Sequence, residues 1–180
     1  MKRAGDLAGR IVRPREAARL FARLRRGGLR LVFTNGVFDL LHAGHVALLH
    51  RARALGDALV VGVNTDASVR RLKGSGRPVV PLPERMELLA GLKAVDYVVP
   101  FAEDTPERLI GLVRPAVLVK GADYRASEIA GRDIVLGAGG RVARVRLRRG
   151  RSTSNLIARA RRALRGWPAA AKRRASRKSR

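Results

Sequence analysis

The sequence contains no cysteine and few aromatic residues, and these absences exclude several kinds of chemistry. Without cysteine there is no disulfide bond, no thiolate nucleophile and no thiolate metal ligand, so a reducing compartment is permitted. Aromatic residues form 4% of the chain, and we find neither a base-stacking platform nor a recognition-helix motif. No apolar run of signal-peptide length follows the first residues, and nowhere do about 18 apolar residues run together. We therefore expect a cytoplasmic protein that does not insert into a membrane.

Acidic residues are scarce as well, which leaves the chain strongly basic. Lysine and arginine number 39 against 14 acidic residues, and the formal net charge is +25. This excess predicts anionic partners such as nucleotides, nucleic acid or an acidic membrane surface, without choosing among them. Residues 169–180 contain no acid and no large apolar side chain. We expect 166–180 to form a disordered tail that makes nonspecific contacts with anions or nucleic acid.

Apolar segments of strand length alternate along the chain with segments of helical periodicity. Continuous Val, Leu and Ile runs of this kind indicate a parallel sheet covered on both faces. We predict a doubly wound, Rossmann-like α/β fold with a parallel five-stranded sheet and helices on both faces. Residues 1–28 form an N-terminal helical extension, 29–165 the domain and 166–180 the tail in this interpretation. The predicted strands are 29–34, 58–63, 96–99, 116–119 and 141–147, and the predicted helices are 15–26, 44–55, 83–92, 106–113, 127–136 and 152–164.

The loop after the first predicted strand carries the strongest site signal, because it holds two of the three histidines of the chain. If the next helix begins near Gly44, His45 lies in its first turn and His42 just before it, so both rings can point toward the same space. Exposed backbone amides and the positive end of the helix dipole favour a phosphate there. Gly36 and Gly44 let the main chain approach such a ligand. His50, farther along the helix, is interpreted as structural.

A histidine pair in this setting suits the transfer of a nucleotide to a phosphate. A sugar phosphate is already anionic near neutral pH, because its second pKa is about 6, so the attacking oxygen needs no general base. The site must instead relieve charge repulsion, align the acceptor with the α-phosphorus and stabilise the charge that builds on the oxygens. Imidazole donors at a helix start meet that demand. We therefore predict a nucleotidyltransferase that releases pyrophosphate.

Over about residues 29–157 the sequence resembles the HxGH nucleotidyltransferase superfamily, and within it the heptose 1-phosphate adenylyltransferases of lipopolysaccharide precursor synthesis. The histidine element is typical of the whole superfamily, whereas the lysine-glycine and aspartate-tyrosine segments are typical of the heptose group. The resemblance implies ATP as co-substrate, Mg²⁺ carried by the triphosphate without protein ligands, and ADP-heptose as product. The matching segments are Phe33-Thr34-Asn35-Gly36-Val37-Phe38-Asp39, His42-Ala43-Gly44-His45, Val63-Asn64-Thr65-Asp66-Ala67-Ser68, Arg71-Leu72-Lys73-Gly74, Leu118-Val119-Lys120-Gly121-Ala122-Asp123-Tyr124 and Ser152-Thr153-Ser154-Asn155.

The resemblance also implies roles for individual residues. His42 and His45 would contact the triphosphate and stabilise the transition state, and Lys73 would bridge the donor and acceptor phosphates. A solvated loop lysine is the structural alternative for Lys73, and the glycines that follow it argue against that alternative. The residues that would bind the nucleotide are Thr34, Asn35, Gly36, Phe38, Gly44, Arg85, Lys120, Gly121, Asp123, Ser152 and Thr153, and those that would bind the acceptor are Asp39, Asn64 and Asp66.

Several of these roles have plain structural alternatives. Arg85 is equally an ordinary surface arginine, and Ser152 and Thr153 can cap the last helix as well as bind the leaving pyrophosphate. Aspartate and asparagine are common in ordinary loops, which weakens the acceptor-site assignments. The last motif also departs from the family pattern, since Arg151 precedes its serine and Ser154 replaces one threonine.

Two other functions stay open at the level of the sequence. A CTP-dependent cytidylyltransferase acting on glycerol 3-phosphate or ethanolamine phosphate shares the HxGH loop and the last-helix motif. A non-enzymatic nucleic-acid-binding protein would account for the charge, with an affinity that falls steeply with salt. Related two-domain enzymes carry a sugar kinase at the N-terminus, and we expect a separate kinase to supply the substrate here. The expected substrates are a sugar 1-phosphate and ATP, and a homodimer is a candidate assembly.

Overall fold

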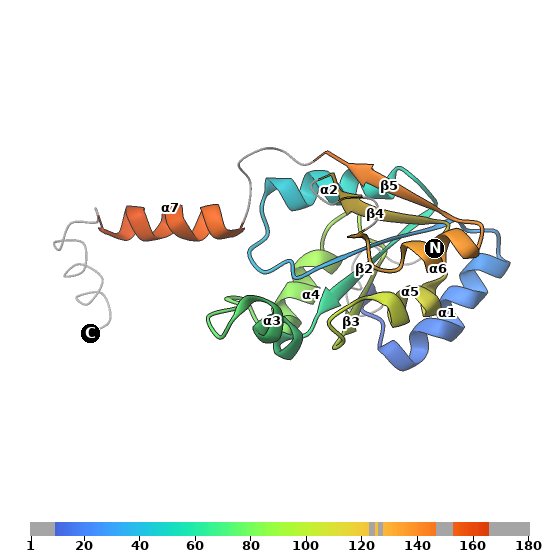
Figure 1. Ribbon diagram of the computed structural model, residues 1–180, viewed down its shortest axis with the longest axis horizontal. Coiled ribbons are helices and arrows are strands. Elements are labelled where there is room, and N and C mark those ends of the chain that lie inside the picture. The colour runs from blue at the N-terminus through green and yellow to red at the C-terminus, as the bar shows by residue number, and fades with distance from the viewer. Residues whose placement is uncertain (1–9, 123–124, 126–127, 147–152, 166–180) are drawn as a thin grey trace.

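Five parallel strands form one sheet in the computed structural model, which describes residues 10–122, 125, 128–146 and 153–165. The strand order is β3-β2-β1-β4-β5, and every neighbouring pair runs parallel (Figure 1). The chain winds outward from β1 in one direction and then from β4 in the other, so the predicted doubly wound fold is confirmed. The strands are β1 (Leu31–Gly36), β2 (Ala58–Asn64), β3 (Tyr97–Phe101), β4 (Val117–Gly121) and β5 (Arg141–Val145).

The sheet is joined unevenly on the two sides of β1. All six residues of β1 pair with β2, from Leu31 opposite Ala58 to Gly36 opposite Val63. Toward β4, only Val32 and Phe33 have paired partners. The carboxyl ends of β1 and β4 therefore separate at the position where the winding direction changes, which is where ligands bind in open sheets of this class.

Helices cover both faces of the sheet because the strands are apolar on both sides. In β2, Ala58 and Val60 belong to one core cluster, and residues 59, 61 and 63 belong to the other. The first cluster is covered by α1 (Pro14–Arg26), α5 (Glu107–Val113) and α6 (Arg132–Gly137), and the second by α2 (Ala43–Arg53) and α4 (Leu82–Ala90). The last helix, α7 (Thr153–Arg165), lies to one side of the sheet (Figure 1).

The N-terminal helix α1 packs directly on the sheet. Its Ala17 and Phe21 are fully buried in the first core cluster, and the Phe21 ring meets the Tyr97 ring edge-on with centroids 5.6 Å apart. Just before the helix, the Val12 amide donates to the Val98 carbonyl oxygen at 2.8 Å. The boundary at residue 28 stays a prediction, and the packing makes α1 part of the domain core.

Two helices differ from those predicted. The α3 helix (Asp66–Lys73) was not predicted, because it is short, polar and buries only one apolar side chain, Val69; the Thr65 hydroxyl caps it by accepting from the Ser68 amide. The predicted helix at 127–136 is shorter in the structure, where the helix begins at Arg132. Gly131 has φ +82°, a left-handed conformation that an α-helix does not contain, and it therefore separates the helix from the residues before it.

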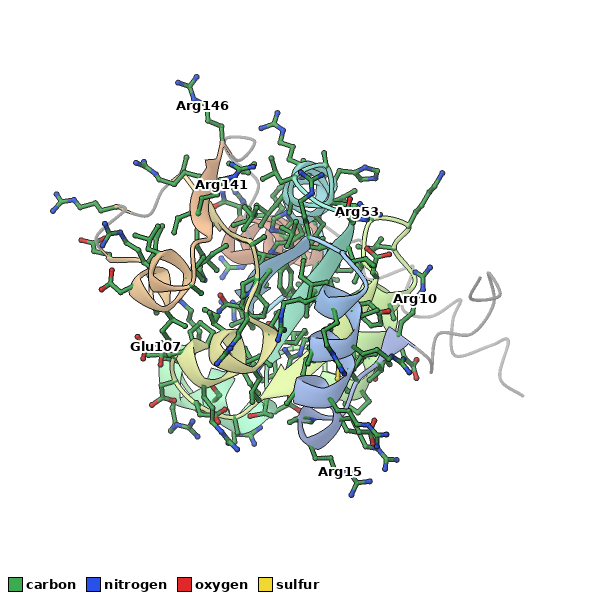
Figure 2. The ribbon with its side chains drawn as sticks, turned by 90° about the vertical axis from the view of Figure 1, so that its right-hand side faces the viewer. Arg10, Arg15, Arg53, Glu107, Arg141 and Arg146 are labelled. Atoms are coloured by element: carbon green, nitrogen blue, oxygen red, sulfur yellow. The ribbon has the colours of Figure 1, made fainter. Side chains whose placement is uncertain are left out.

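Much of the basic charge lies outside the core. The side chains of Arg15 and Arg146 extend away from the sheet (Figure 2). None of the helices in the described parts of the chain combines the length and the apolar character needed to cross a membrane. The predicted basic tail, 166–180, lies outside the described residues.

Candidate functional site

A cleft of about 300 Å³ opens at the carboxyl ends of β1, β2 and β4, next to the position where the sheet separates. Five of the residues predicted for the site meet there, although they are far apart in the sequence. The wall contributed by residues 104–106 and 128–130 was not predicted from the sequence, because no motif marks these segments. The lining residues are Asn35, Gly36, Val37, Asn64, Leu72, Lys73, Asp104, Thr105, Pro106, Lys120, Glu128, Ile129 and Ala130.

The two histidines stack on one another at the start of α2. Their ring centroids are 3.8 Å apart and the ring planes differ by 20°. His42 is the N-cap residue, and its Nδ1 accepts from the backbone amides of Gly44 at 3.1 Å and His45 at 3.4 Å. An Nδ1 that accepts these bonds carries no proton, so the neutral His42 ring has its N–H at Nε2. Both side chains keep part of their surface exposed, as a ligand-contacting pair requires.

His45 is held in a neutral state by its surroundings. Burial, and secondarily the adjacent His42, lower the pKa of His45 from 6.5 to about 4. Its Nδ1 is buried and lacks a hydrogen-bond partner among the described residues. Because an N–H is more costly to bury unpaired than an acceptor, we place the proton on Nε2. The ring is then a neutral donor at physiological pH.

Phe38 connects the histidine pair to the cleft. Its ring meets the His45 ring at a centroid distance of 5.1 Å and an angle of 61°. On its other side, a Cβ added at Gly36 would lie 3.2 Å from the Phe38 ring, closer than such atoms normally approach. Phe38 is 4% exposed and has φ +49°, a strained value for a non-glycine residue. It was predicted to line the nucleotide pocket; in the structure its ring is buried and supports His45 from below the surface.

Two lysines approach the cleft from opposite halves of the sheet. Lys73 ends α3 and is exposed, and Lys120 lies near the end of β4. Lys120 Nζ donates to Asn35 Oδ1, which connects β4 to β1 beyond their last paired residues. Both ammonium groups border the same cleft, so they supply positive charge on two sides of any anion bound there.

Thr34 and Asp39 are placed differently from the prediction that they contact a ligand. Thr34 is fully buried, and its hydroxyl donates to the Val119 carbonyl oxygen at 3.0 Å within the sheet. Asp39 is 1% exposed and accepts hydrogen bonds from Arg77 Nε and from the amides of Val79 and Val80. Both side chains are therefore engaged with the protein itself.

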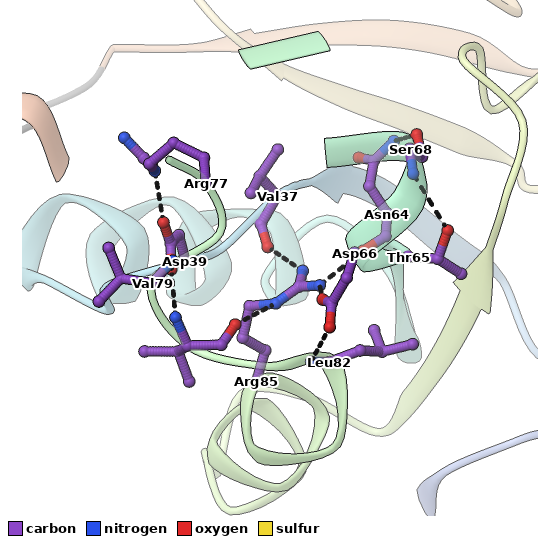
Figure 3. A network of polar contacts seen from close by, with 11 residues as sticks. Val37, Asp39, Asn64, Thr65, Asp66, Ser68, Arg77, Val79, Leu82 and Arg85 are labelled. Carbon is purple, nitrogen blue, oxygen red and sulfur yellow. Dashed lines mark hydrogen bonds and ion pairs between the residues drawn. The ribbon is translucent and has the colours of Figure 1, made fainter. Parts of the chain in front are cut away.

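Arg85 is neither a surface arginine nor a phosphate-facing one. Its side chain is fully buried, and its guanidinium donates to the carbonyl oxygens of Val80, Val37 and Asn64 and to the Asp66 carboxylate (Figure 3). These acceptors occupy four of its five N–H groups. The guanidinium therefore joins three segments inside the domain, around residues 37, 64–66 and 80. Asp66, predicted for the acceptor, is engaged in that network.

The remaining predicted residues divide into those near the cleft and those elsewhere. Asn64 lines the cleft, and its Nδ2 donates to Ser68 Oγ at 3.0 Å. Gly44 lies in the first turn of α2 and Gly121 ends β4, both buried. Thr153 begins α7, which borders a second cavity of about 650 Å³ together with Gly76, Arg77 and Val79. Asp123 and Ser152 lie outside the described residues, as do Tyr124 and Arg151.

No group of three or more His, Cys, Asp or Glu side chains within the described ranges could hold a metal ion. The lining of the cleft includes the ammonium groups of Lys73 and Lys120 and the carboxylates of Asp104 and Glu128.

Comparison with known proteins connects this geometry to a family. Residues 33–163 match the family model described as cytidylyltransferase-like. The chain is 61% identical over 135 residues to the bifunctional protein HldE of Alkalilimnicola ehrlichii, 61% over 137 residues to that of Halorhodospira halophila and 59% over 133 residues to that of Vibrio parahaemolyticus. These alignments cover 74 to 76% of this chain and 28 to 29% of the relatives, so the chain spans less than a third of their length.

Two solved structures share the fold. A lipopolysaccharide core biosynthesis protein from Thermoplasma volcanium is 31% identical with a TM-score of 0.56, and the match covers 67% of this chain and 98% of that one. A pantoate-beta-alanine ligase from Francisella tularensis has a TM-score of 0.59 over 80% of this chain and 68% of that one. At 14% identity, the second likeness concerns the fold alone.

Proposed function

The chain belongs to the cytidylyltransferase-like family of nucleotidyltransferases, and from this premise we propose that it transfers AMP from ATP to a heptose 1-phosphate. The products are ADP-heptose and pyrophosphate, and the reaction serves the synthesis of lipopolysaccharide precursors. The observation that carries the proposal is the stacked histidine pair at the start of α2, which Phe38 links to Gly36 at the edge of a cleft bordered by two lysines. The similarity to HldE proteins and to a lipopolysaccharide core biosynthesis protein supports this choice of substrate.

The reaction requires charge control more than proton transfer. An oxygen of the sugar phosphate attacks the α-phosphorus of ATP, a new P–O bond forms, and the bond to the bridging oxygen breaks. Pyrophosphate leaves with the electron pair. Because the attacking oxygen is already anionic, the protein has to hold two polyanions together and stabilise the charge of the transition state.

The histidines supply hydrogen bonds in this proposal. With its proton on Nε2, each neutral ring donates to oxygens of the triphosphate, and the stacked arrangement presents both donors from one place. The low pKa of His45 keeps its ring neutral at physiological pH, so its contribution is that of a fixed donor. Phe38 and the capping bonds of His42 fix the two ring orientations.

The lysines hold the phosphates from both sides. Lys73 bridges the donor and acceptor phosphates, and Lys120, oriented by Asn35, faces the nucleotide. Asn64 borders the part of the cleft assigned to the acceptor. Mg²⁺ enters as a complex with ATP. The pyrophosphate contacts assigned to Ser152 and Thr153, the nucleotide contact of Asp123, a homodimer and a cytoplasmic location are further parts of the proposal that derive from the sequence.

A substrate panel tests the proposal. Pyrophosphate release is measured with ATP or CTP against heptose 1-phosphate, glycerol 3-phosphate and ethanolamine phosphate, each with Mg²⁺. We expect turnover with ATP and heptose 1-phosphate. Turnover with CTP and glycerol 3-phosphate, together with none with heptose 1-phosphate, would assign the protein to the cytidylyltransferase alternative. Salt-sensitive nucleic-acid binding without turnover on any pair would favour the non-enzymatic alternative.

A further inference from the structure

The buried carboxylate of Asp39 connects two segments of the proposed active site. Asp39 follows β1 on the loop that leads to the histidines, and its oxygens face residues 77–80 (Figure 3). Oδ1 accepts from the amides of Val79 and Val80, each at 2.8 Å, and Oδ2 accepts from Arg77 Nε. The carboxylate thereby holds a segment that lies 38 to 41 residues away in the sequence.

Arg85 strengthens the same connection from the other side. Its Nε donates to the Val80 carbonyl oxygen at 3.0 Å, while its Nη1 donates to the Val37 carbonyl oxygen. The side chains of Asp39 and Arg85 therefore both join residues 77–80 to residues 37–39. Asp39 and Arg85 are each at most 1% exposed. Buried networks with most of their partners satisfied fix one arrangement of the chain.

The segment that Asp39 holds follows directly after Lys73. Between Lys73 and Arg77 the chain reads Gly74-Ser75-Gly76, and all three of these residues are exposed. Gly74 has φ +92°, so it directs the chain away from α3 in a conformation open to glycine. The Arg77 amide donates to the Gly74 carbonyl oxygen at 3.1 Å, so a tight turn connects the end of α3 to the segment that Asp39 holds. Without that segment, α3 alone would secure Lys73 on one side only. The contacts of Asp39 supply the second attachment.

We propose that Asp39, with Arg77, is a positioning residue that fixes Lys73 relative to the histidine pair, in place of the substrate-binding role that its sequence position suggests. The inference rests on the proposed nucleotidyl transfer. It also explains why the Asp39 carboxylate is tolerated near a site for polyanions, because the carboxylate is paired with Arg77 and two backbone amides. Burial alone would raise the pKa of Asp39, but the hydrogen bonds from Val80, Val79 and Arg77 outweigh it and lower the pKa. The carboxylate therefore stays ionised and keeps its partners.

The variant Asp39→Asn tests this role, because it keeps the side-chain shape and removes the charge that holds Arg77. Asp57→Asn is the matched control, since Asp57 also pairs with an arginine, Arg30, but on the exposed surface. We expect Asp39→Asn to lower kcat by about 10- to 100-fold, as small displacements of catalytic groups do, with the KM for the acceptor changed far less. A rise in the acceptor KM with kcat unchanged would make Asp39 a substrate ligand and overturn the proposal.

A double-mutant cycle then identifies the residue through which Asp39 acts. Lys73→Ala should cost much less turnover in the Asp39→Asn background than in the wild type, by a factor of about 5 or more, because residues that share one function are not additive. Additive losses would mean that Asp39 acts elsewhere.

Amide hydrogen exchange separates this inference from the proposed function, because it needs no substrate. In Asp39→Asn, the amides of Val79 and Val80 should exchange at least about 10-fold faster while those of α2 stay protected, and Asp57→Asn should change neither. Unchanged exchange at Val79 and Val80 would overturn the inference whatever the substrate is. If wild-type protein transfers no nucleotide to any acceptor of the panel, the proposed function fails, and the same cycle is then read from ATP affinity by calorimetry.

Discussion

The imidazole rings of His42 and His45 stack with centroids 3.8 Å apart, so protonating both would place two positive charges face to face. The capping bonds to His42 Nδ1 and the burial of His45 both favour neutral rings. The site thus combines a neutral donor pair with cationic lysines, and each part can be tested separately.

Loss of the His45 ring should abolish most of the turnover without unfolding the protein. We expect His45→Ala to reduce turnover by at least about 100-fold, because it removes one preorganised donor to the transition state. Pyrophosphate release measures this, and circular dichroism checks the fold. His50→Ala is the control, since His50 lies exposed on the same helix and should leave turnover unchanged. Near-normal turnover of His45→Ala would reduce His45 to a packing residue.

Acidification should destabilise the domain through His45. Because its pKa falls from 6.5 to about 4 on folding, the unfolded chain binds a proton that the native protein excludes between these values. The free energy of unfolding therefore decreases as the pH falls through this window, by about 3 kcal/mol once the pH is below 4. Denaturant titrations at neutral pH and at the lower end of the window measure the change, and His45→Asn should lose correspondingly less stability. Equal losses in both proteins would contradict the shifted pKa.

Removal of Arg85 should be among the most destabilising single changes in the domain. Arg85→Met leaves three carbonyl oxygens and the Asp66 carboxylate without their donor, at a cost of about 3–5 kcal/mol in the free energy of unfolding. Arg71→Met is the comparison, because the Arg71–Asp104 pair is exposed and contributes about 0–1 kcal/mol. Chemical denaturation of both variants measures the difference. Equal costs would show that the buried network adds nothing beyond a surface ion pair.

Two glycines allow steric and conformational effects to be separated. Gly131 and Gly139 have φ of +82° and +78°, so an alanine at either is strained by about 1–2 kcal/mol. A Cβ at Gly131 would also lie 2.3 Å from Ile110 Cδ1, whereas none of the described atoms lies within 4 Å of one at Gly139. Gly131→Ala should therefore lower the free energy of unfolding by about 1–3 kcal/mol more than Gly139→Ala. Equal thermal and denaturant midpoints for the two variants would contradict the close contact.

The strands were predictable from the sequence because most of them are rich in Val, Leu and Phe, and the inner strands bury both of their faces. The edge strand β5, with two arginines, is mostly not buried. Residues 58–63 were predicted as a strand, and β2 is buried along its entire length. The α3 helix escaped prediction because Val69 alone gives it an apolar contact, and its cap at Thr65 resembles an ordinary loop residue. Element boundaries moved by a few residues where a glycine such as Gly131 sets the chain direction.

Motif spacing predicted which loops meet at the site but not what each side chain does there. The histidine pair, Lys73 and Lys120 lie at or next to the carboxyl edge of the sheet, on or beside α2, α3 and β4, while their catalytic roles stay predictions. Asp39 was assigned to the acceptor, and Arg85 to a phosphate or equally to the surface, because a charged residue in a loop or at a helix start gives no sign that other segments will enclose it. Their burial depends on contacts between segments about 40 to 50 residues apart, which periodicity and local motifs do not encode.

Because β1 and β4 pair over only two residues, the boundary between these strands has few main-chain hydrogen bonds. Beyond Val32 and Phe33 the two halves of the sheet are held together by side-chain bonds such as those from Thr34 and Lys120. A nucleotide bound by Lys73 on one half of the sheet and by Lys120 on the other would add a reversible cross-link between the two halves. Substrate binding should then reduce the relative motion of the two halves of the sheet, and product release should restore that motion.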